Sequence, residues 1–98
     1  MPGFRLSERA EADLVVIFDY TLQAFGAFQA EAYVEGLKRS CGLIVDFPGI
    51  GTAADELLPG MRRFRFQSHL IFYSVVNEVV VVRAFVHARR SVRGELFE

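Results

Sequence analysis

The hydrophobic periodicity of the chain changes once, near Pro48, and this change constrains the fold more than any other feature. Before that point, apolar residues recur at spacings of three and four, as on one face of an α-helix. From residue 61 onwards they alternate with polar residues or form valine-rich runs, as in β-strands. No repeat or linker interrupts the 98 residues, so we expect a single domain over 1–98 with a helical half and a strand half.

The helical half divides into two helices at Gly26. Ser7 is a suitable N-cap, because its hydroxyl can accept a hydrogen bond from a free backbone N–H group. The first helix should run from there to about Phe25, and Gly26 should end it in a left-handed conformation. A second helix is expected over about 27–46, since Pro48 disfavours helical geometry in the residue before it. With so short a connection, the two helices should pack as an antiparallel hairpin.

Four segments have the pattern of strands. They are a short extended stretch over 3–6 and strands over 61–67, 68–76 and 79–86, with a tight turn at Asn77-Glu78 and a loop over 49–60. The last strand is so rich in valine that both of its faces should be covered, which favours a central position. The order β-α-α-β-β-β predicts an α+β fold in which the hairpin packs on one face of a small, mostly antiparallel sheet. The core should include Leu14, Ile17, Leu37, Ile44, Phe72 and Val82.

The single cysteine, Cys41, excludes an internal disulfide and suits a reducing compartment such as the cytoplasm. The first residues lack an apolar core preceded by positive charge, so no signal peptide is expected. No apolar run approaches the roughly 18 residues that a membrane-spanning helix needs. Two histidines and one cysteine, at 69, 87 and 41, lack the spacing of metal ligands, so no metal site is expected.

The charge is unevenly distributed along the chain. Residues 1–59 carry four Lys/Arg and nine Asp/Glu, whereas residues 60–98 carry seven Arg and three acids, so the net charges are −5 and +4. Such a domain can offer a basic face to an acidic partner. Alternatively, the same arginines have no binding role and are only the solvent-exposed edge of a sheet. The candidate docking residues of the basic half are Arg63, Arg65, Arg83, His87, Arg89 and Arg90.

Several short motifs follow one another in a definite order along the chain. The stretch 6–14, LSERAEADL, is similar to an opening L-x-x-x-A-x-x-D-L pattern, and 47–51, FPGIG, is similar to a P-x-x-G loop. Residues 62–73 look like a central hairpin and 87–90, HARR, like a closing H-x-R-R box. Together they resemble the RelE/ParE toxin superfamily, and its ParE branch most closely. Ser91 departs from the pattern, since many relatives carry Asp or another polar residue there.

This resemblance implies the toxin of a type II toxin–antitoxin pair, encoded on a chromosome or plasmid. In the ParE branch the target is DNA gyrase and a ParD-like antitoxin neutralises the toxin, which uses no cofactor and performs no chemistry itself. An antitoxin helix could lie along Phe18, Phe28 and Val34, which flank the main apolar stripes. Those residues could equally serve internal packing.

Two alternatives remain open from the sequence. A RelE-like ribosome-dependent mRNA endonuclease would need acid–base groups and cations for the phosphate, and Arg63, Arg65, Arg83, His87 and Arg89 are candidates. The late tyrosine that such nucleases often carry is missing, because the last tyrosine is Tyr73. His69 is expected to be a partly buried strand residue beside Tyr73. A degenerate toxin that only binds its antitoxin is the other alternative.

Overall fold

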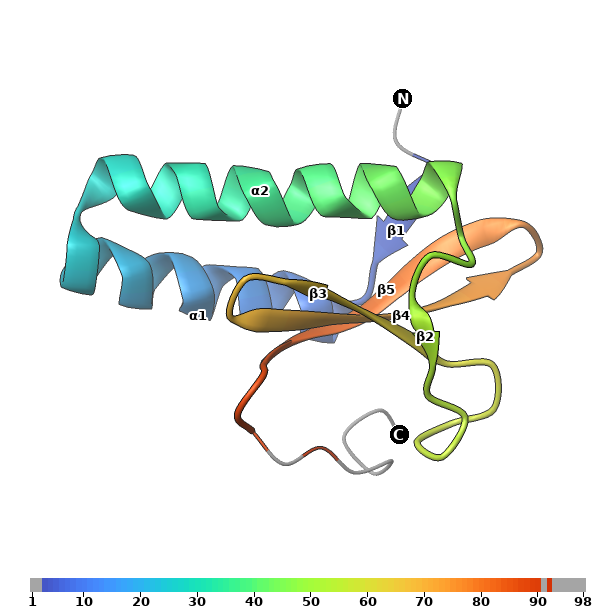
Figure 1. The fold of residues 1–98 in the computed structure, drawn as a ribbon. Coiled ribbons are helices and arrows are strands. Elements are labelled where there is room, and N and C mark those ends of the chain that lie inside the picture. The colour runs from blue at the N-terminus through green and yellow to red at the C-terminus, as the bar shows by residue number, and fades with distance from the viewer. Residues whose placement is uncertain (1–2, 91, 93–98) are drawn as a thin grey trace.

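A computed structural model describes residues 3–90 and 92 of the chain, and it has the expected order of elements (Figure 1). The helices are α1 (Glu8–Phe25) and α2 (Ala27–Asp46). The strands are β1 (Phe4–Leu6), β2 (Thr52–Ala53), β3 (Arg62–Phe66), β4 (His69–Val76) and β5 (Val79–His87). Ser91, which departs from the family pattern, and residues 93–98 lie outside the described part.

All five strands form one sheet in the order β1-β5-β4-β3-β2. The strand β1 pairs with β5 in parallel, and the other three pairings are antiparallel. The two helices lie side by side over one face of this sheet (Figure 1). The predicted α+β fold is therefore confirmed, with β5 inside the sheet as its valine content indicated.

Local sequence fixes the helix ends much as expected. The Ser7 hydroxyl accepts a hydrogen bond from the Ala10 N–H group at 3.0 Å and donates one to the Arg83 carbonyl at 2.9 Å, so it caps α1 and ties it to β5. Gly26 has φ 92° and ψ 171°, so the left-handed helical conformation predicted there is wrong. The residue still needs positive φ, because it ends α1 and starts α2 without an intervening loop.

The main core lies between the helices and the sheet. All six predicted core residues are buried, and Leu37, Ile44, Phe72 and Val82 are completely inaccessible. Phe25, the last residue of α1, is 64% exposed although it is aromatic. The reason is visible in Figure 1, where the end of the helical hairpin extends beyond the sheet.

A second, smaller core covers part of the opposite face of the sheet. The residues after β2 fold back so that Ala54 and Met61 pack with Phe72, Ala84 and Val86. Both faces of β5 are thus covered, as the sequence predicted. The loop expected over 49–60 contains one short strand, β2, because Thr52 and Ala53 pair with the start of β3.

A β-bulge interrupts the ladder between β4 and β5. Tyr73 pairs with Val82 and Phe72 pairs with Ala84, so Arg83 is an extra residue on β5. Beyond the bulge, the Phe85 N–H group donates to the Asp13 carboxylate of α1 at 3.0 Å. The shift in register places His69 opposite His87.

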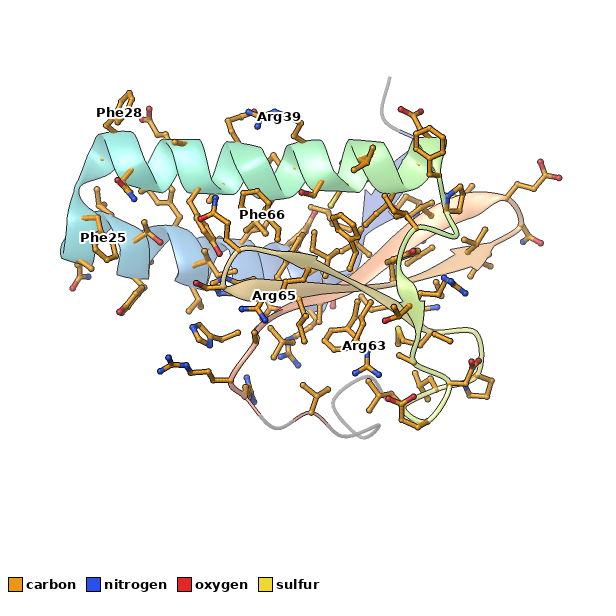
Figure 2. The ribbon with its side chains drawn as sticks, in the orientation of Figure 1. Phe25, Phe28, Arg39, Arg63, Arg65 and Phe66 are labelled. Carbon is orange, nitrogen blue, oxygen red and sulfur yellow. The ribbon has the colours of Figure 1, made fainter. Side chains whose placement is uncertain are left out.

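The middle of α2 approaches β3 very closely at Gly36. A β-carbon at this position would lie 2.3 Å from the Phe66 ring, so only glycine leaves room for that side chain. Figure 2 shows Phe66 reaching from β3 towards α2. Gly42, on the same helix, has no such contact, so close packing explains only the first of the two glycines.

Candidate functional site

The arginines of β3 point away from the helices. Phe64 and Phe66 pack against the main core, and the alternation of the strand turns Arg63 and Arg65 to the other face. Figure 2 shows both arginines on the side of β3 opposite α2. The face that the helices leave uncovered is therefore basic along β3.

Arg63 is occupied by an ion pair. Its guanidinium donates to the Glu56 carboxylate at 2.6 Å. The pKa of Glu56 is lowered by two hydrogen bonds to its carboxylate. One comes from the backbone N–H group of Glu56 itself, and the other comes from the Arg63 guanidinium. Exposed pairs of this kind add little to stability, but this one leaves Arg63 less available to a partner than its position in the sequence suggested.

Arg83 lies apart from the other candidates. As the bulged residue it projects to the uncovered face, where its Nε group donates to the Ser74 hydroxyl at 3.0 Å. Arg5, Val76 and Val79 line the same hollow of about 360 Å³. Arg83 thus lines the same hollow as Arg5 of β1, which the sequence analysis did not single out.

Three of the predicted residues do come together. Arg65, His87 and Arg89 line a hollow of about 190 Å³ with Ser68 and Ala88, which we name the cationic hollow. The Nε group of Arg65 donates to the Gln67 carbonyl at 2.7 Å, which orients its guanidinium. Within residues 3–90 and 92, no carboxylate forms an ion pair with Arg65 or Arg89.

Arg90 follows this group on the surface. It is exposed, and its backbone N–H group donates to the His87 carbonyl at 2.9 Å, which closes the turn after β5. Its position allows docking, although it lines neither the cationic hollow nor the hollow beside Arg83.

A larger hollow of about 320 Å³ adjoins the cationic one and shares Ser68 and His87 with it. Aromatic side chains make up much of its wall, so we name it the aromatic hollow. Its lining consists of Tyr20, Thr21, Phe25, Gln29, Tyr33, Gln67, Ser68, His69 and His87.

His69 is half-buried in this wall, as predicted, but its neighbours differ from those expected. Its Nδ1 atom lies 2.7 Å from the Tyr33 hydroxyl, and its ring stands 5.3 Å from that of His87. It was expected beside Tyr73, whose hydroxyl instead binds the loop after α2. Burial lowers the pKa of His69, and the neighbouring His87 lowers it further.

Hydrogen bonds orient both imidazole rings. The Ser68 N–H group donates to the Tyr33 hydroxyl at 3.3 Å, and burial raises the pKa of Tyr33. The Tyr33 hydroxyl and His69 Nδ1 share one hydrogen bond. The Arg89 N–H group donates to His87 Nδ1 at 3.1 Å, so this nitrogen is an acceptor and Nε2 is the ring nitrogen of His87 that can donate.

The sequence analysis did not identify Tyr33 as a candidate site residue. The sequence analysis also did not predict the hydrogen bonds that hold the loop after α2. The buried Tyr73 hydroxyl donates to the Pro48 carbonyl at 2.7 Å and accepts from the Gly51 N–H group at 3.0 Å. Arg62 donates to the Gly51 carbonyl at 2.5 Å, while its buried Nε atom has no partner among the described residues. The FPGIG motif was the feature of the sequence that could have indicated a loop fixed by hydrogen bonds to the sheet.

The three residues assigned to an antitoxin groove do not share one environment. Val34 packs against the main core and Phe18 is half-buried, whereas Phe28 is 87% exposed. Figure 2 shows Phe28 and Phe25 at the free end of the helical hairpin. Several other apolar side chains of the helices are exposed as well, namely Val15, Val16, Tyr20, Leu22 and Leu43.

The described residues hold no group of three or more His, Cys, Asp or Glu side chains that could bind a metal ion. Cys41 is buried in the main core, and burial raises the pKa of its thiol to about 12. In the described part of the chain, neither helix is long and apolar enough to cross a membrane.

Comparison with known proteins places these features in one family. The family model of the ParE toxin of the type II toxin–antitoxin system parDE matches residues 4–92. A protein named Toxin ParE1 from Caulobacter vibrioides is 36% identical over 96 residues, which cover 98% of this chain and 99% of that protein. A Toxin ParE1 from Mycobacterium tuberculosis is 38% identical over 95 residues, covering 95% and 96%.

More distant relatives show the same similarity. The Toxin ParE of Escherichia coli is 30% identical over 97 residues, covering 98% of this chain and 94% of that protein. A solved structure described as a chromosomal ParDE TA system from P. aeruginosa has the same fold, with a TM-score of 0.74 at 16% identity. The match covers 89% of this chain and 98% of the other.

Proposed function

This chain belongs to the ParE toxin family of type II toxin–antitoxin systems, and we propose that it poisons DNA gyrase and is held inactive by a ParD-like antitoxin. The observation that carries the proposal is the cationic hollow. Its Arg65, His87 and Arg89 are all exposed, near the turn at Ser68 where β3 and β5 end. Arginines that form no ion pair with a carboxylate of the described residues suit docking onto carboxylates or phosphates of a target.

The antitoxin part of the proposal rests on the exposed apolar side chains of the helical hairpin. Val16 is 66% exposed and Phe28 is 87% exposed, and contiguous exposed apolar surface is typical of protein–protein interaction sites. An amphipathic antitoxin helix would cover this surface. Both proposed partners imply a cytoplasmic protein.

One observation favours a second candidate, a ribosome-dependent mRNA endonuclease. Tyr33, His69 and His87 stand together beside two arginines, and this set contains both proton carriers and phosphate-binding cations. The two candidates differ in what His87 does. As a docking residue it contributes one hydrogen bond, whereas as an acid or base it would be essential.

The experiment follows growth arrest together with two reactions in vitro, gyrase-dependent DNA breaks and cleavage of ribosome-bound mRNA. We expect DNA breaks without mRNA cleavage. Arg65→Gln and Arg89→Gln should reduce the breaks by graded amounts, because single exposed charges contribute modestly to association. His87→Gln should keep most of the activity.

Arg39→Gln is the matched control, since Arg39 is an exposed arginine on the far side of α2 (Figure 2). It should leave both reactions unchanged. Codon-periodic mRNA cuts that His87→Gln lowers by about 10²–10⁴-fold would instead establish the endonuclease. Antitoxin binding with neither reaction would identify a degenerate toxin.

A further inference from the structure

The lining of the two adjoining hollows is unusual in its chemistry. On the cationic side, two guanidinium groups and the Nε2 group of His87 offer hydrogen-bond donors. Among the residues that the structure describes, no aspartate or glutamate lines either hollow. The positive charge of the two arginines is therefore not offset within this lining, which makes it a local site for an anion.

The second part of this surface, the aromatic hollow, is lined by exposed aromatic rings. Tyr20 is 69% exposed and Phe25 is 64% exposed, and both line the aromatic hollow with the half-buried Tyr33. Exposed rings of this kind stack on planar groups. Gln29 and Gln67 lie in the same lining and can both donate and accept hydrogen bonds.

We propose that these two hollows together bind one nucleotide of a single-stranded nucleic acid, with its phosphate in the cationic hollow and its base against the aromatic rings. Ser68 and His87 line both hollows, so the hollows adjoin each other, as sites for the phosphate and the base of one nucleotide must. Aromatic stacking next to an arginine that binds the backbone is how proteins bind single strands without reading sequence.

An acidic peptide fits this surface less well. A glutamate side chain would satisfy the arginines, but it would leave the exposed rings of Tyr20 and Phe25 uncovered. A nucleotide uses both parts at once. The site goes beyond the proposed gyrase target and can be tested with nucleic acid alone.

The test measures binding of a fluorescent ten-residue oligothymidylate to the purified chain by anisotropy at several salt concentrations. Tyr20→Ala should weaken binding at least about fivefold, since stacking of a base on one ring contributes that much or more. Arg89→Gln should weaken binding and lower the salt slope by about 0.7, the value for one lost phosphate contact on a single strand. Both residues are exposed, so the fold should be retained.

The controls separate stacking from charge. Arg39→Gln removes the same charge on the far side of α2 and should change binding less than twofold. An abasic strand with the same phosphates should bind more weakly than oligothymidylate. Equal binding of the abasic strand, an equal loss in Arg39→Gln, or no binding of oligothymidylate would overturn the proposal. Tighter binding of deca-glutamate at the same residues would overturn it in favour of an acidic peptide.

Discussion

At the scale of single residues, one hydroxyl group holds the loop that follows the helices. Tyr73 is completely buried, and its oxygen joins the Pro48 carbonyl to the Gly51 N–H group. A β-carbon on Gly51 would lie 2.7 Å from this oxygen, so the loop passes as close to the sheet as glycine allows. The loop in turn leads into β2 and the second core.

Tyr73→Phe tests this role. The substitution leaves the ring in place but leaves two backbone groups without their partner, so the free energy of unfolding should fall by about 1–3 kcal/mol. Urea unfolding measures the change. Tyr20→Phe is the matched control, because the side chain of Tyr20 is largely exposed and should change stability little. Equal effects of the two substitutions would contradict the anchoring role.

His69 makes the stability of the fold depend on pH. Burial keeps its pKa below the ordinary value of 6.5, so in the unfolded chain His69 takes up a proton at a higher pH than in the folded chain. The unfolded state therefore binds more protons below about pH 6.5, and the folded state loses stability as the pH falls through this window. Above the window the contribution is fully present.

The measurement compares unfolding free energies at pH 7.5 and pH 5.5 for the wild type and for His69→Gln. The variant also loses the bond to Tyr33, so the change between the two pH values is compared rather than the absolute stability. We expect a smaller decrease on acidification in the variant. An identical decrease in both proteins would rule out His69 as the titrating group.

At the scale of elements, two glycines of α2 have opposite roles. Gly36 makes room for the Phe66 ring, whereas a β-carbon on Gly42 would meet nothing within 4 Å. Glycine inside a helix is otherwise unfavourable by about 1 kcal/mol relative to alanine. The packing of α2 on β3 therefore requires one glycine and tolerates the other at a cost.

Gly36→Ala should lower the free energy of unfolding by about 1–3 kcal/mol, because overpacking displaces Phe66. Gly42→Ala should raise it by up to about 1 kcal/mol through helix propensity. Thermal and urea unfolding of both variants check the signs. If Gly36→Ala does not fold, adding Phe66→Leu should restore folding. Two stabilising or two destabilising substitutions would refute the distinction.

At the scale of the whole molecule, a 98-residue domain leaves much apolar surface outside its two cores. Domains of this size bury only roughly two-thirds of the surface that the unfolded chain exposes. Here the exposed apolar residues concentrate on the outer side and the free end of the helical hairpin. The stability margin should therefore depend on the antitoxin that covers them.

Saturating antitoxin should raise the melting temperature of the toxin. A ligand that binds only the folded state adds about 2.7 kcal/mol at 100 times its Kd, which for a domain of this size corresponds to a rise of roughly 10–20 °C. Differential scanning fluorimetry of toxin with increasing antitoxin measures the rise. Phe28→Ser should reduce it by weakening the complex, and an unchanged melting temperature at saturation would contradict the expected dependence.

The amino-acid sequence by itself determined the elements of this protein apart from β2. Helix bounds followed from Ser7, Gly26 and Pro48, and the core faces followed from apolar spacing, because caps and periodicity act between near neighbours. The tight turn at Asn77-Glu78 was predicted in the same way, and both residues do adopt positive φ. Arg65, His87 and Arg89 could be assigned to a site from the charge of the second half.

Only the tertiary structure decided how the site is assembled. A regular ladder from the Asn77-Glu78 turn would place Val86 opposite His69, and the bulge at Arg83 places His87 there instead. Since a shift of one residue turns every later side chain to the other face, no local pattern reveals this pairing. The bulged segment is bound by Ser7 and by Asp13, residues more than 70 positions away in the chain. Contacts at that separation exist only once the helices have packed on the sheet.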